Sequence, residues 1–264
     1  MGAPRRVLVV GACGRMGECV RAALAGEPSL RLAAALEAPG HPRLGSELAP
    51  GVPLRDDIKA ALANSDVAID FSHPLASLPV LRAAAEAGVA YVMGTTGLSD
   101  GERAELALAA RRIPVLHSPN FSVSVHVLIW LVREAARRLG PGYDAEIVEL
   151  HHAQKRDAPS GTALRLAEAI AEGRGHALAG HLVLERAGET GARPAGAIGI
   201  QALRAGDSTG EHSVFYAGEG ERLELVHRSQ TRDHFARGAV RAAAWLTGRA
   251  AGLYRIEQAL GLES

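Results

Sequence analysis

The chain has few cysteines, few lysines and no excess of charge of either sign. Only Cys13 and Cys19 occur among its 264 residues, which excludes a disulfide framework and a paired CxxC metal site. The 29 basic and 29 acidic side chains balance, so the chain lacks the positive charge with which proteins hold nucleic acid by its phosphates. No stretch approaches the ~18 consecutive apolar residues of a membrane span, and no cleavable signal precedes the first predicted strand. We therefore expect a cytoplasmic protein that binds neither nucleic acid nor membrane.

Lysine is unusually scarce. Of the 29 basic residues, only Lys59 and Lys155 are lysines and the remaining 27 are arginines. Arginine stays protonated in proteins, whereas lysine can release a proton or act as a compact point charge for a carboxylate. A lysine that lies beside other reactive side chains in this chain is therefore a candidate for acid–base or anion-binding chemistry.

The first half of the chain alternates short β-branched runs with helical stretches rich in alanine and leucine. Such alternation predicts βαβ crossovers and a parallel sheet. The segment from Pro39 to Pro53 is rich in proline and glycine, and we predict a loop there. The predicted strands are 7–10, 32–36, 66–71, 90–93 and 114–117, and the predicted helices lie near 15–26, 75–87 and 100–111.

The pattern changes after Asn120. A long amphipathic helix is predicted around 122–139, a strand at 143–152, a helix from Ser160, and strands near 197–203, 211–217 and 221–228. Strands separated by turn signals indicate an open, mixed or mostly antiparallel sheet. The tail from Asp233 is rich in alanine and predicted to be helical. We expect an α/β fold in which a βαβ domain is interrupted by a second, sheet-rich domain.

A glycine-rich turn, GACGRMG at 11–17, follows the first predicted strand and precedes a helix. Gly14 and Gly17 match the second and third glycines of the dinucleotide-binding GxGxxG pattern, but Ala12 occupies the first position and Gly11 lies one residue early. A glycine turn alone is equally typical of an ordinary strand-to-helix connection. Glu37 ends the next strand 20 residues after Gly17, where a carboxylate can accept hydrogen bonds from ribose hydroxyls. This position favours the nucleotide interpretation.

Two more loops, FSHP at 71–74 and GTTG at 94–97, follow predicted strands of the same sheet. Ligands of open α/β sheets bind beyond the carboxyl ends of the strands. We therefore expect both loops on the cofactor side, although a GTTG sequence by itself is more often only a turn.

The densest cluster of reactive side chains lies in the segment HHAQKRDAPSGT at 151–162. A histidine titrates near neutral pH and suits general acid catalysis, but a lone His151–His152 pair is more often a surface or packing feature. Adjacent histidines do not have the spacing of a zinc motif, so no metal is predicted. Lys155 strengthens the catalytic interpretation. The helix predicted to begin at Ser160 offers free N–H groups to an anionic ligand, which indicates a substrate that carries a carboxylate.

Several sequence blocks resemble the 4-hydroxy-tetrahydrodipicolinate reductase (dihydrodipicolinate reductase) family. The blocks occur in family order and cover nearly the whole chain, and the segment HHxxKxDAPSGTA is highly specific. They are GACGRMG, GTTG, SPNFS at 118–122, ELHHAQKRDAPSGTAL at 149–164, and LRAGDSTGEHSVFYAGEGERLELVHRSQTRDHFARGAV at 203–240.

The resemblance implies a Rossmann-type dinucleotide-binding domain, residues 1–121 with 233–264, and an inserted α+β substrate-binding and tetramerisation domain with an open mixed sheet, residues 122–232. It implies reduction of a cyclic dicarboxylate with NADH or NADPH in lysine biosynthesis through diaminopimelate. His151 would donate or accept a proton, and Lys155 would donate a second proton or pair with charge. His152, Gly161 and Thr162 would bind substrate. The implied cofactor-binding residues are Gly11, Ala12, Cys13, Gly14, Arg15, Met16, Glu37, Gly94, Thr95, Thr96, Ser118, Pro119, Asn120 and Phe121.

The chain departs from the family where NADPH is recognised. Members that use NADPH well often follow the ribose-binding acid with an arginine, whereas Glu37 is followed by Ala38 and Pro39. We therefore expect a preference for NADH, with Arg15, His41 or Arg43 as alternative partners for a 2′-phosphate. Two other functions stay open: a Rossmann-type reductase of an amino-acid semialdehyde, and a dinucleotide sensor without catalysis.

Overall fold

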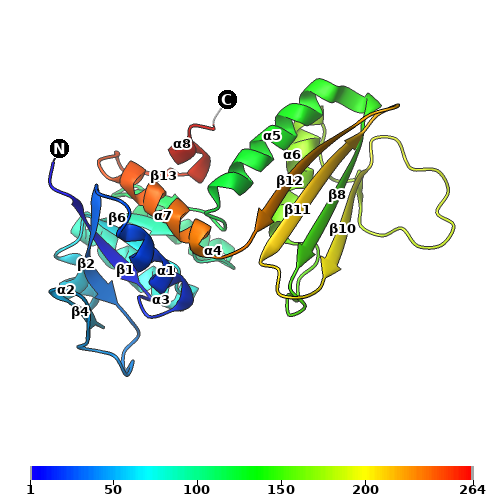
Figure 1. Cartoon of the computed structure of the whole chain (residues 1–264). Helices are drawn as coiled ribbons and strands as arrows, with labels where there is room; N and C mark the ends of the chain where they lie inside the picture. The colour runs from blue at the N-terminus through cyan, green and yellow to red at the C-terminus, as the bar shows by residue number, and fades with distance from the viewer. Residues whose placement is uncertain (1, 263–264) are drawn as a thin grey trace. The chain divides into compact units, whose positions relative to one another are not determined.

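The computed structural model describes residues 2–262. The chain divides into two compact units: residues 1–123 with 232–264, and residues 124–231. Within the described residues, no helix is both long and apolar enough to cross a membrane. Each unit has its own sheet (Figure 1).

The first unit is built on an eight-stranded sheet in the order β13-β7-β6-β5-β1-β2-β4-β3. Neighbouring strands pair in parallel except β3 and β4, which are antiparallel. The central strands β5 and β6 are buried at every position, as expected for a parallel sheet covered on both faces. The strands are β1 (Arg5–Val10), β2 (Leu30–Leu36), β3 (Glu47–Ala49), β4 (Val52–Arg55), β5 (Val67–Asp70), β6 (Ala90–Met93), β7 (Pro114–His117) and β13 (Gly252–Tyr254).

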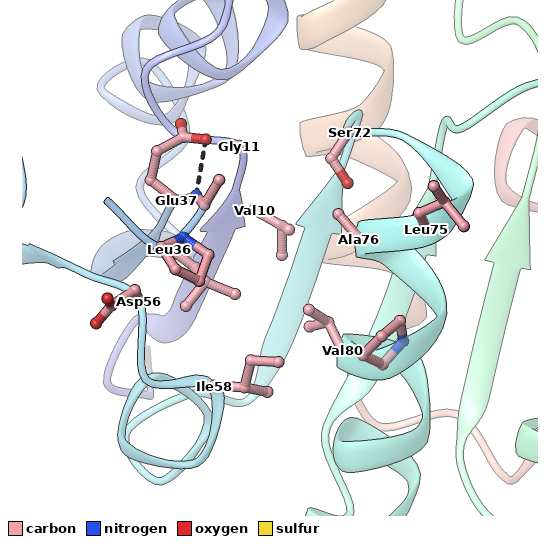
Figure 2. Close-up of a pocket in the computed structure, with 13 residues that line it drawn as sticks. Val10, Gly11, Leu36, Glu37, Asp56, Ile58, Ser72, Leu75, Ala76 and Val80 are labelled. Carbon is pink, nitrogen blue, oxygen red and sulfur yellow. Dashed lines mark hydrogen bonds between the residues drawn. The ribbon is translucent and has the colours of Figure 1, made fainter. Parts of the chain in front are cut away.

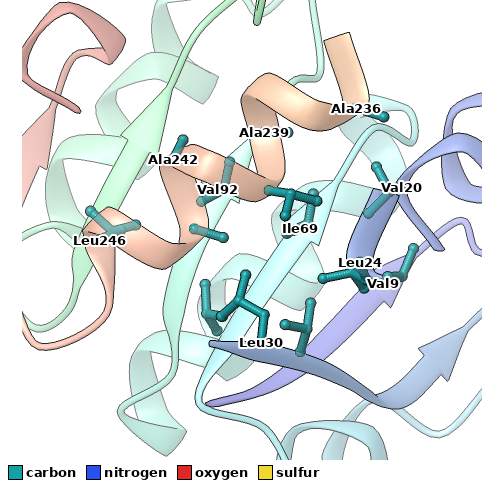
Figure 3. Packing of buried hydrophobic residues seen from close by; sticks show 14 of the residues in the cluster. Val9, Val20, Leu24, Leu30, Ile69, Val92, Ala236, Ala239, Ala242 and Leu246 are labelled. Carbon is teal, nitrogen blue, oxygen red and sulfur yellow. The ribbon is translucent and has the colours of Figure 1, made fainter. Parts of the chain in front are cut away.

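Helices cover both faces of this sheet. On one face, Val20 and Leu24 of α1 (Arg15–Leu24) and Ala239 and Leu246 of α7 (Asp233–Leu246) pack on the strands, together with α8 (Ile256–Leu260) (Figure 3). The other face is covered by α2 (Ile58–Leu62), α3 (Pro74–Ala87) and α4 (Asp100–Ala109). Helix α7 therefore returns the C-terminal part of the chain to the unit that the N-terminal part begins.

The loop predicted from Pro39 to Pro53 is confirmed over residues 39–46 and wrong beyond them, where β3 and β4 form. The hairpin of β3 and β4 begins in this segment, with Gly51 in its turn at a φ of 72°. Leu54 is buried in the core, and Pro53 is tolerated because the pairing of β4 with β2 begins only at Leu54 and its pairing with β3 is irregular at Pro53. The tail is likewise not wholly helical, because β13 pairs in parallel with β7. The two helices of the tail are confirmed in its remaining parts.

The second unit holds a five-stranded mixed sheet in the order β12-β11-β8-β10-β9. Strand β8 pairs in parallel with β10 and antiparallel with β11. The alternating burial along β8 places Ala145 and Ile147 on the covered face and Glu146 and Val148 on the other. The strands are β8 (Asp144–His151), β9 (Leu182–Val183), β10 (Ile198–Arg204), β11 (Gly210–Ala217) and β12 (Arg222–Ser229).

One face of this sheet is covered by α5 (Val123–Leu139) and α6 (Gly161–Arg174), with the short 3-10 helix η1 (Gly140–Gly142) after α5. Val132 of α5 and Leu166 of α6 are fully buried with Ile147 of β8. The opposite face carries no helix of this unit (Figure 1). The expected α/β class, with a Rossmann-type sheet and a second mixed sheet, is confirmed.

Candidate active site

The glycine turn after β1 is shaped by backbone contacts. Gly11 has a φ of 68°, and its carbonyl oxygen accepts a hydrogen bond from the Gly14 N–H at 3.0 Å. A Cβ on Gly17 would lie only 2.1 Å from the Gly11 oxygen, so a side chain there would disrupt the turn. Gly14 caps α1 without a side-chain acceptor. The N-terminus of α1 is therefore suited to attract phosphate oxygens.

Glu37 lies against this turn. One carboxylate oxygen accepts the backbone N–H of Cys13 at 3.0 Å, and the other accepts the N–H of Ala38 at 3.1 Å. These bonds hold the acid beside the turn, where the sequence analysis expects a ribose to bind. The loop after β2 also brings His41 near. One potential metal-ligating atom from each of Cys13, Glu37 and His41 lies within 4.8 Å of the other two. These three residues belong to the same candidate nucleotide site.

A pocket of about 380 Å³ opens beside Glu37. Figure 2 shows Gly11 and Glu37 on one side of it and Leu75, Ala76 and Val80 of α3 on the other. Its mostly apolar lining with a few polar groups suits a flat organic ring. Sequence reasoning missed most of this lining, because the residues come from separate segments. The lining residues are Val10, Gly11, Leu36, Glu37, Ala38, Pro39, Asp56, Ile58, Ser72, Leu75, Ala76, Pro79 and Val80.

A buried hydrogen-bond network supports the loops after β5 and β6. Asp70 accepts hydrogen bonds from the Tyr91 hydroxyl at 2.6 Å and the Ser72 N–H at 2.7 Å. The Thr95 hydroxyl is 2.7 Å from the Ser77 hydroxyl, so the Thr95 side chain belongs to this network. Burial, followed by the charge of Asp70, raises the pKa of Tyr91 well above its usual value and keeps its hydroxyl protonated. This buried network therefore links the loop at 71–74 (FSHP) to the loop at 94–97 (GTTG).

The other predicted residues of the GTTG and SPNFS loops divide into buried and exposed positions. A Cβ on Gly94 would collide with the Phe71 ring, and Thr96 is exposed. The Ser118 N–H donates to the Met93 oxygen at 3.1 Å, which joins the loop after β7 to the end of β6. Phe121 is 1% exposed. Of the remaining residues, Arg15 and Pro119 are exposed, Met16 and Asn120 are half-buried, and Ala12 is buried.

In the second unit, His151 is the last residue of β8 and lies on its covered face. Its Nδ1 is 2.5 Å from a carboxylate oxygen of Glu149, which is fully buried. The strand ends before His152, whose backbone N–H instead donates to the Ser208 oxygen at 2.8 Å. Burial lowers the pKa of His151 and outweighs the opposing effect of Glu149; nearby Lys155 lowers it further. The two histidines therefore have different environments.

Lys155 forms a two-pronged ion pair with Asp157, with Nζ 2.9 and 2.8 Å from the two carboxylate oxygens. The hydrogen bond from Lys155 holds the pKa of Asp157 below its usual value. The Lys155 ammonium is thus a charged group at the edge of the His151 cluster.

Helix α6 begins immediately after this segment. Ser160 is its N-cap and accepts the Ala163 N–H at 3.1 Å, while Gly161 and Thr162 form the first turn. A side chain on Gly161 would meet no atom within 4 Å, so its backbone faces open space. The Ser160 hydroxyl is also 3.1 Å from Nε2 of His212, a buried histidine that the sequence analysis did not single out. Only the register of β11 against β8 brings His212 here.

Comparison with known proteins agrees with this arrangement. Residues 5–121 match the family model "Dihydrodipicolinate reductase, N-terminus", and residues 124–260 match "Dihydrodipicolinate reductase, C-terminus". The chain is 51% identical to the 4-hydroxy-tetrahydrodipicolinate reductase of Anaeromyxobacter dehalogenans strain 2CP-1, covering 97% of this chain and 98% of that one. It is 47% identical to the same-named protein of Desulfotalea psychrophila, covering 98% of each.

Among solved structures, the chain is similar to a dipicolinate-bound dihydrodipicolinate reductase from Paenisporosarcina sp. TG-14. The TM-score is 0.78 and the identity 26%, over 96% of this chain and 97% of that one. The similarity extends over both units rather than the nucleotide-binding half alone. On these grounds, the chain belongs to the dihydrodipicolinate reductase family.

Proposed function

We propose that this protein is an NAD(P)H-dependent 4-hydroxy-tetrahydrodipicolinate reductase that acts in lysine biosynthesis through diaminopimelate. The observation that carries the proposal is the cluster at the end of β8: His151 held by a buried carboxylate, beside Lys155 and the first turn of α6. When bound, the reduced nicotinamide supplies a hydride, and the net reaction also takes up one proton and releases one water. A non-catalytic sensor has no need of this cluster.

The first unit would bind the cofactor. The glycine turn and the N-terminus of α1 would receive the pyrophosphate, and Glu37 the adenosine ribose. The apolar pocket beside Glu37 has the lining that an adenine ring needs. The loops at 94–96 and 118–121 would orient the nicotinamide, chiefly through backbone groups because the Thr95 side chain is engaged below. We propose residues 1–121 with 233–264 as the cofactor domain.

The second unit would bind the substrate. The two carboxylates of the substrate need positive charge and N–H donors, which Lys155, His152 and the backbone of Gly161 and Thr162 can provide. His151 would supply the proton. Because Lys155 is already paired as an ammonium with Asp157, we assign it the role of binding charge. We propose residues 122–232 as the substrate-binding and tetramerisation domain.

We also propose a homotetramer in the cytoplasm. The uncovered face of the second sheet carries apolar side chains, with Leu203 50% and Val226 41% exposed. Apolar side chains on an uncovered sheet face are typical of surfaces buried by a second subunit. Analytical ultracentrifugation of the purified chain tests this assembly. A monomer at micromolar concentration would contradict it.

A preference for NADH over NADPH is the final element of the proposal. Ala38 and Pro39, which follow Glu37, offer no positive charge to a 2′-phosphate. Of the alternative phosphate partners, Arg43 lies 4.0 Å from the Glu18 carboxylate, which competes for its charge. We therefore expect a higher kcat/KM with NADH. Comparable values for the two cofactors would refute this preference.

The decisive experiment is cofactor oxidation with substrate generated from aspartate semialdehyde and pyruvate. The expected result is substrate-dependent loss of absorbance at the nicotinamide band, which is much slower in the variants His151→Gln and Lys155→Ala. Binding of NADH without turnover would instead support a sensor. Turnover of aspartate semialdehyde alone would support a semialdehyde reductase.

A further inference from the structure

Glu149 is a fully buried carboxylate that no motif in the sequence analysis assigned a role. It lies two residues before His151 on β8, so both side chains project from the same, covered face of the sheet. Burying a charged carboxylate is costly unless the charge is paired and hydrogen-bonded. The contacts of Glu149 therefore indicate the role of its charge.

Both carboxylate oxygens of Glu149 are hydrogen-bonded by groups from β8, β10 and the start of α6. One oxygen accepts the Ser160 N–H at 3.0 Å and an Arg204 N–H at 2.9 Å. The other accepts a second Arg204 N–H at 2.9 Å and faces His151 Nδ1 at 2.5 Å. Arg204 is at the end of β10, in register with His151. Burial alone would raise the pKa of Glu149, but the bonds from Arg204, His151 and Ser160 outweigh it and lower the pKa.

An ionised carboxylate can only accept hydrogen bonds, so the Nδ1 that faces it must carry a proton. The exchangeable position of the ring is then Nε2. Gly210, the first residue of β11, lies beside this atom: a Cβ on Gly210 would be 2.8 Å from Nε2. A side chain at position 210 would therefore crowd Nε2, which the glycine avoids.

The ring of His212 packs edge-on against His151, with the ring centroids 5.3 Å apart and the planes at 78°. This contact opposes rotation of the His151 ring. Burial, and next the charge of His151, lowers the pKa of His212 to about 3. His212 therefore stays neutral and adds no second positive charge beside His151 when the latter is protonated.

We propose that Glu149 is a positioning residue that fixes His151 as the Nδ1–H tautomer, so that Nε2 alone exchanges a proton with the substrate. The inference rests on the proposed function. In the step, the Nε2–H bond of the His151 imidazolium breaks, its electron pair stays on the ring, and the proton bonds to the substrate. The one proton that the net reaction takes up from solvent then restores Nε2–H.

The variant Glu149→Gln tests this role because it keeps the shape of the side chain. The amide has one acceptor oxygen, which the Ser160 and Arg204 donors require, so its NH₂ would face Nδ1 and force the Nε2–H tautomer. We expect kcat to fall by about 10²-fold or more, with KM and the NADH dissociation constant within about threefold. Adding Glu149→Gln to His151→Gln should cause no further loss, because the two residues act as one unit.

The matched control is Glu134→Gln. Glu134 is also an arginine-paired carboxylate of the second unit, on α5, with its pKa lowered mainly by the Arg137 hydrogen bond, but it faces no described catalytic residue. It should leave kcat, KM and the pH profile unchanged. Glu149→Asp keeps the charge and should recover part of the lost kcat.

The tautomer itself can be observed in the wild-type protein with ¹⁵N-labelled histidine, using His151→Gln to assign the His151 signals. The expected result is protonated Nδ1 and unprotonated Nε2 in the neutral form, inverted in Glu149→Gln. A wild-type spectrum with the proton on Nε2 would overturn the proposal even if the variant did not fold. So would a folded Glu149→Gln enzyme with unchanged kcat. Absence of wild-type turnover would refute the proposed function and leave the tautomer result standing.

Discussion

The candidate binding sites of the two units are formed by different kinds of chemical group. In the first unit, the nucleotide turn depends on backbone: glycines at 11, 14 and 17, free N–H groups at a helix N-terminus, and loops supported by a buried hydrogen-bond network around Asp70. In the second unit, the cluster depends on side chains whose charges are buried and paired, with Glu149, His151 and Arg204 at its centre. The difference indicates that steric change should damage the first unit, and changes of charge or protonation the second.

The largest effect is expected from His151→Gln. Removing the proposed general acid should reduce kcat by about 10²–10⁴-fold, because that is the usual contribution of positioned proton transfer. NADH binding, measured by fluorescence titration, should be unchanged since the cofactor residues belong to the other unit. A large loss of NADH affinity in this variant would contradict the proposal that the first unit binds the cofactor and the second unit binds the substrate.

Gly17→Ala tests the steric side of the comparison. Its methyl group would meet the Gly11 carbonyl oxygen at 2.1 Å, and we expect a loss of about 1–3 kcal/mol in unfolding free energy. NADH affinity should fall as the turn is displaced. Gly101→Ala on α4 is the control, because a Cβ there meets nothing within 4 Å, and it should not destabilise the protein. Equal Tm values for the two variants would contradict the steric argument.

His212 makes the second unit sensitive to acid. Its pKa is lowered to about 3 in the folded protein, chiefly by burial, against about 6.5 when unfolded. Below pH 6.5 the unfolded chain therefore binds a proton that the folded chain does not bind. As the pH is lowered from 6.5 to about 3, the free energy of unfolding decreases. Between pH 7 and 5 the loss from this residue is about 2 kcal/mol.

Urea unfolding of the wild type and of His212→Gln at both pH values measures this contribution. The variant should lose less stability on acidification, whatever its stability at pH 7. If both proteins show the same change between the two pH values, His212 is not the buried neutral group described above.

The smallest expected effect concerns cofactor choice. Ala38→Arg would place a guanidinium next to Glu37, where it can pair with a 2′-phosphate. We expect the ratio of kcat/KM for NADPH to that for NADH to rise by about tenfold, equivalent to about 1.4 kcal/mol. His41→Arg, on the same loop, offers a comparison at a second position. A ratio unchanged by Ala38→Arg would show that the phosphate does not bind beside residue 38.

The sequence predicted most of the fold, and its failures have specific causes. The buried strands VLVV and AYVM and the capped helices carried strong local patterns. The β3–β4 hairpin was missed because its proline and glycine residues are typical of loops, although Pro50-Gly51 followed by alternating Val52 and Leu54 is also compatible with a hairpin. Strand β13 has three residues and exists only by pairing with β7, which no local pattern could predict.

The residues of the candidate site likewise divide into those that the sequence predicted and those that it did not. Motif spacing and the scarcity of lysine pointed to Glu37, Lys155 and the first turn of α6, and the family resemblance assigned His151 its role. All of these residues are close together in sequence or lie at a fixed offset from a glycine turn. The partners of His151 were not predictable in that way. Arg204 and His212 lie 53 and 61 residues farther along the chain, counting 204 − 151 and 212 − 151. They reach His151 through the register of β10 and β11 with β8.

The amino-acid sequence by itself thus determined the main strands and helices, the glycine turn and the identity of the reactive residues, since these depend on local conformational preference and on short spacings. The tertiary structure decided which ring nitrogen of His151 is available and which carboxylate stays charged. Those properties depend on burial and on hydrogen bonds between distant strands, and they come into existence only when the second sheet is assembled.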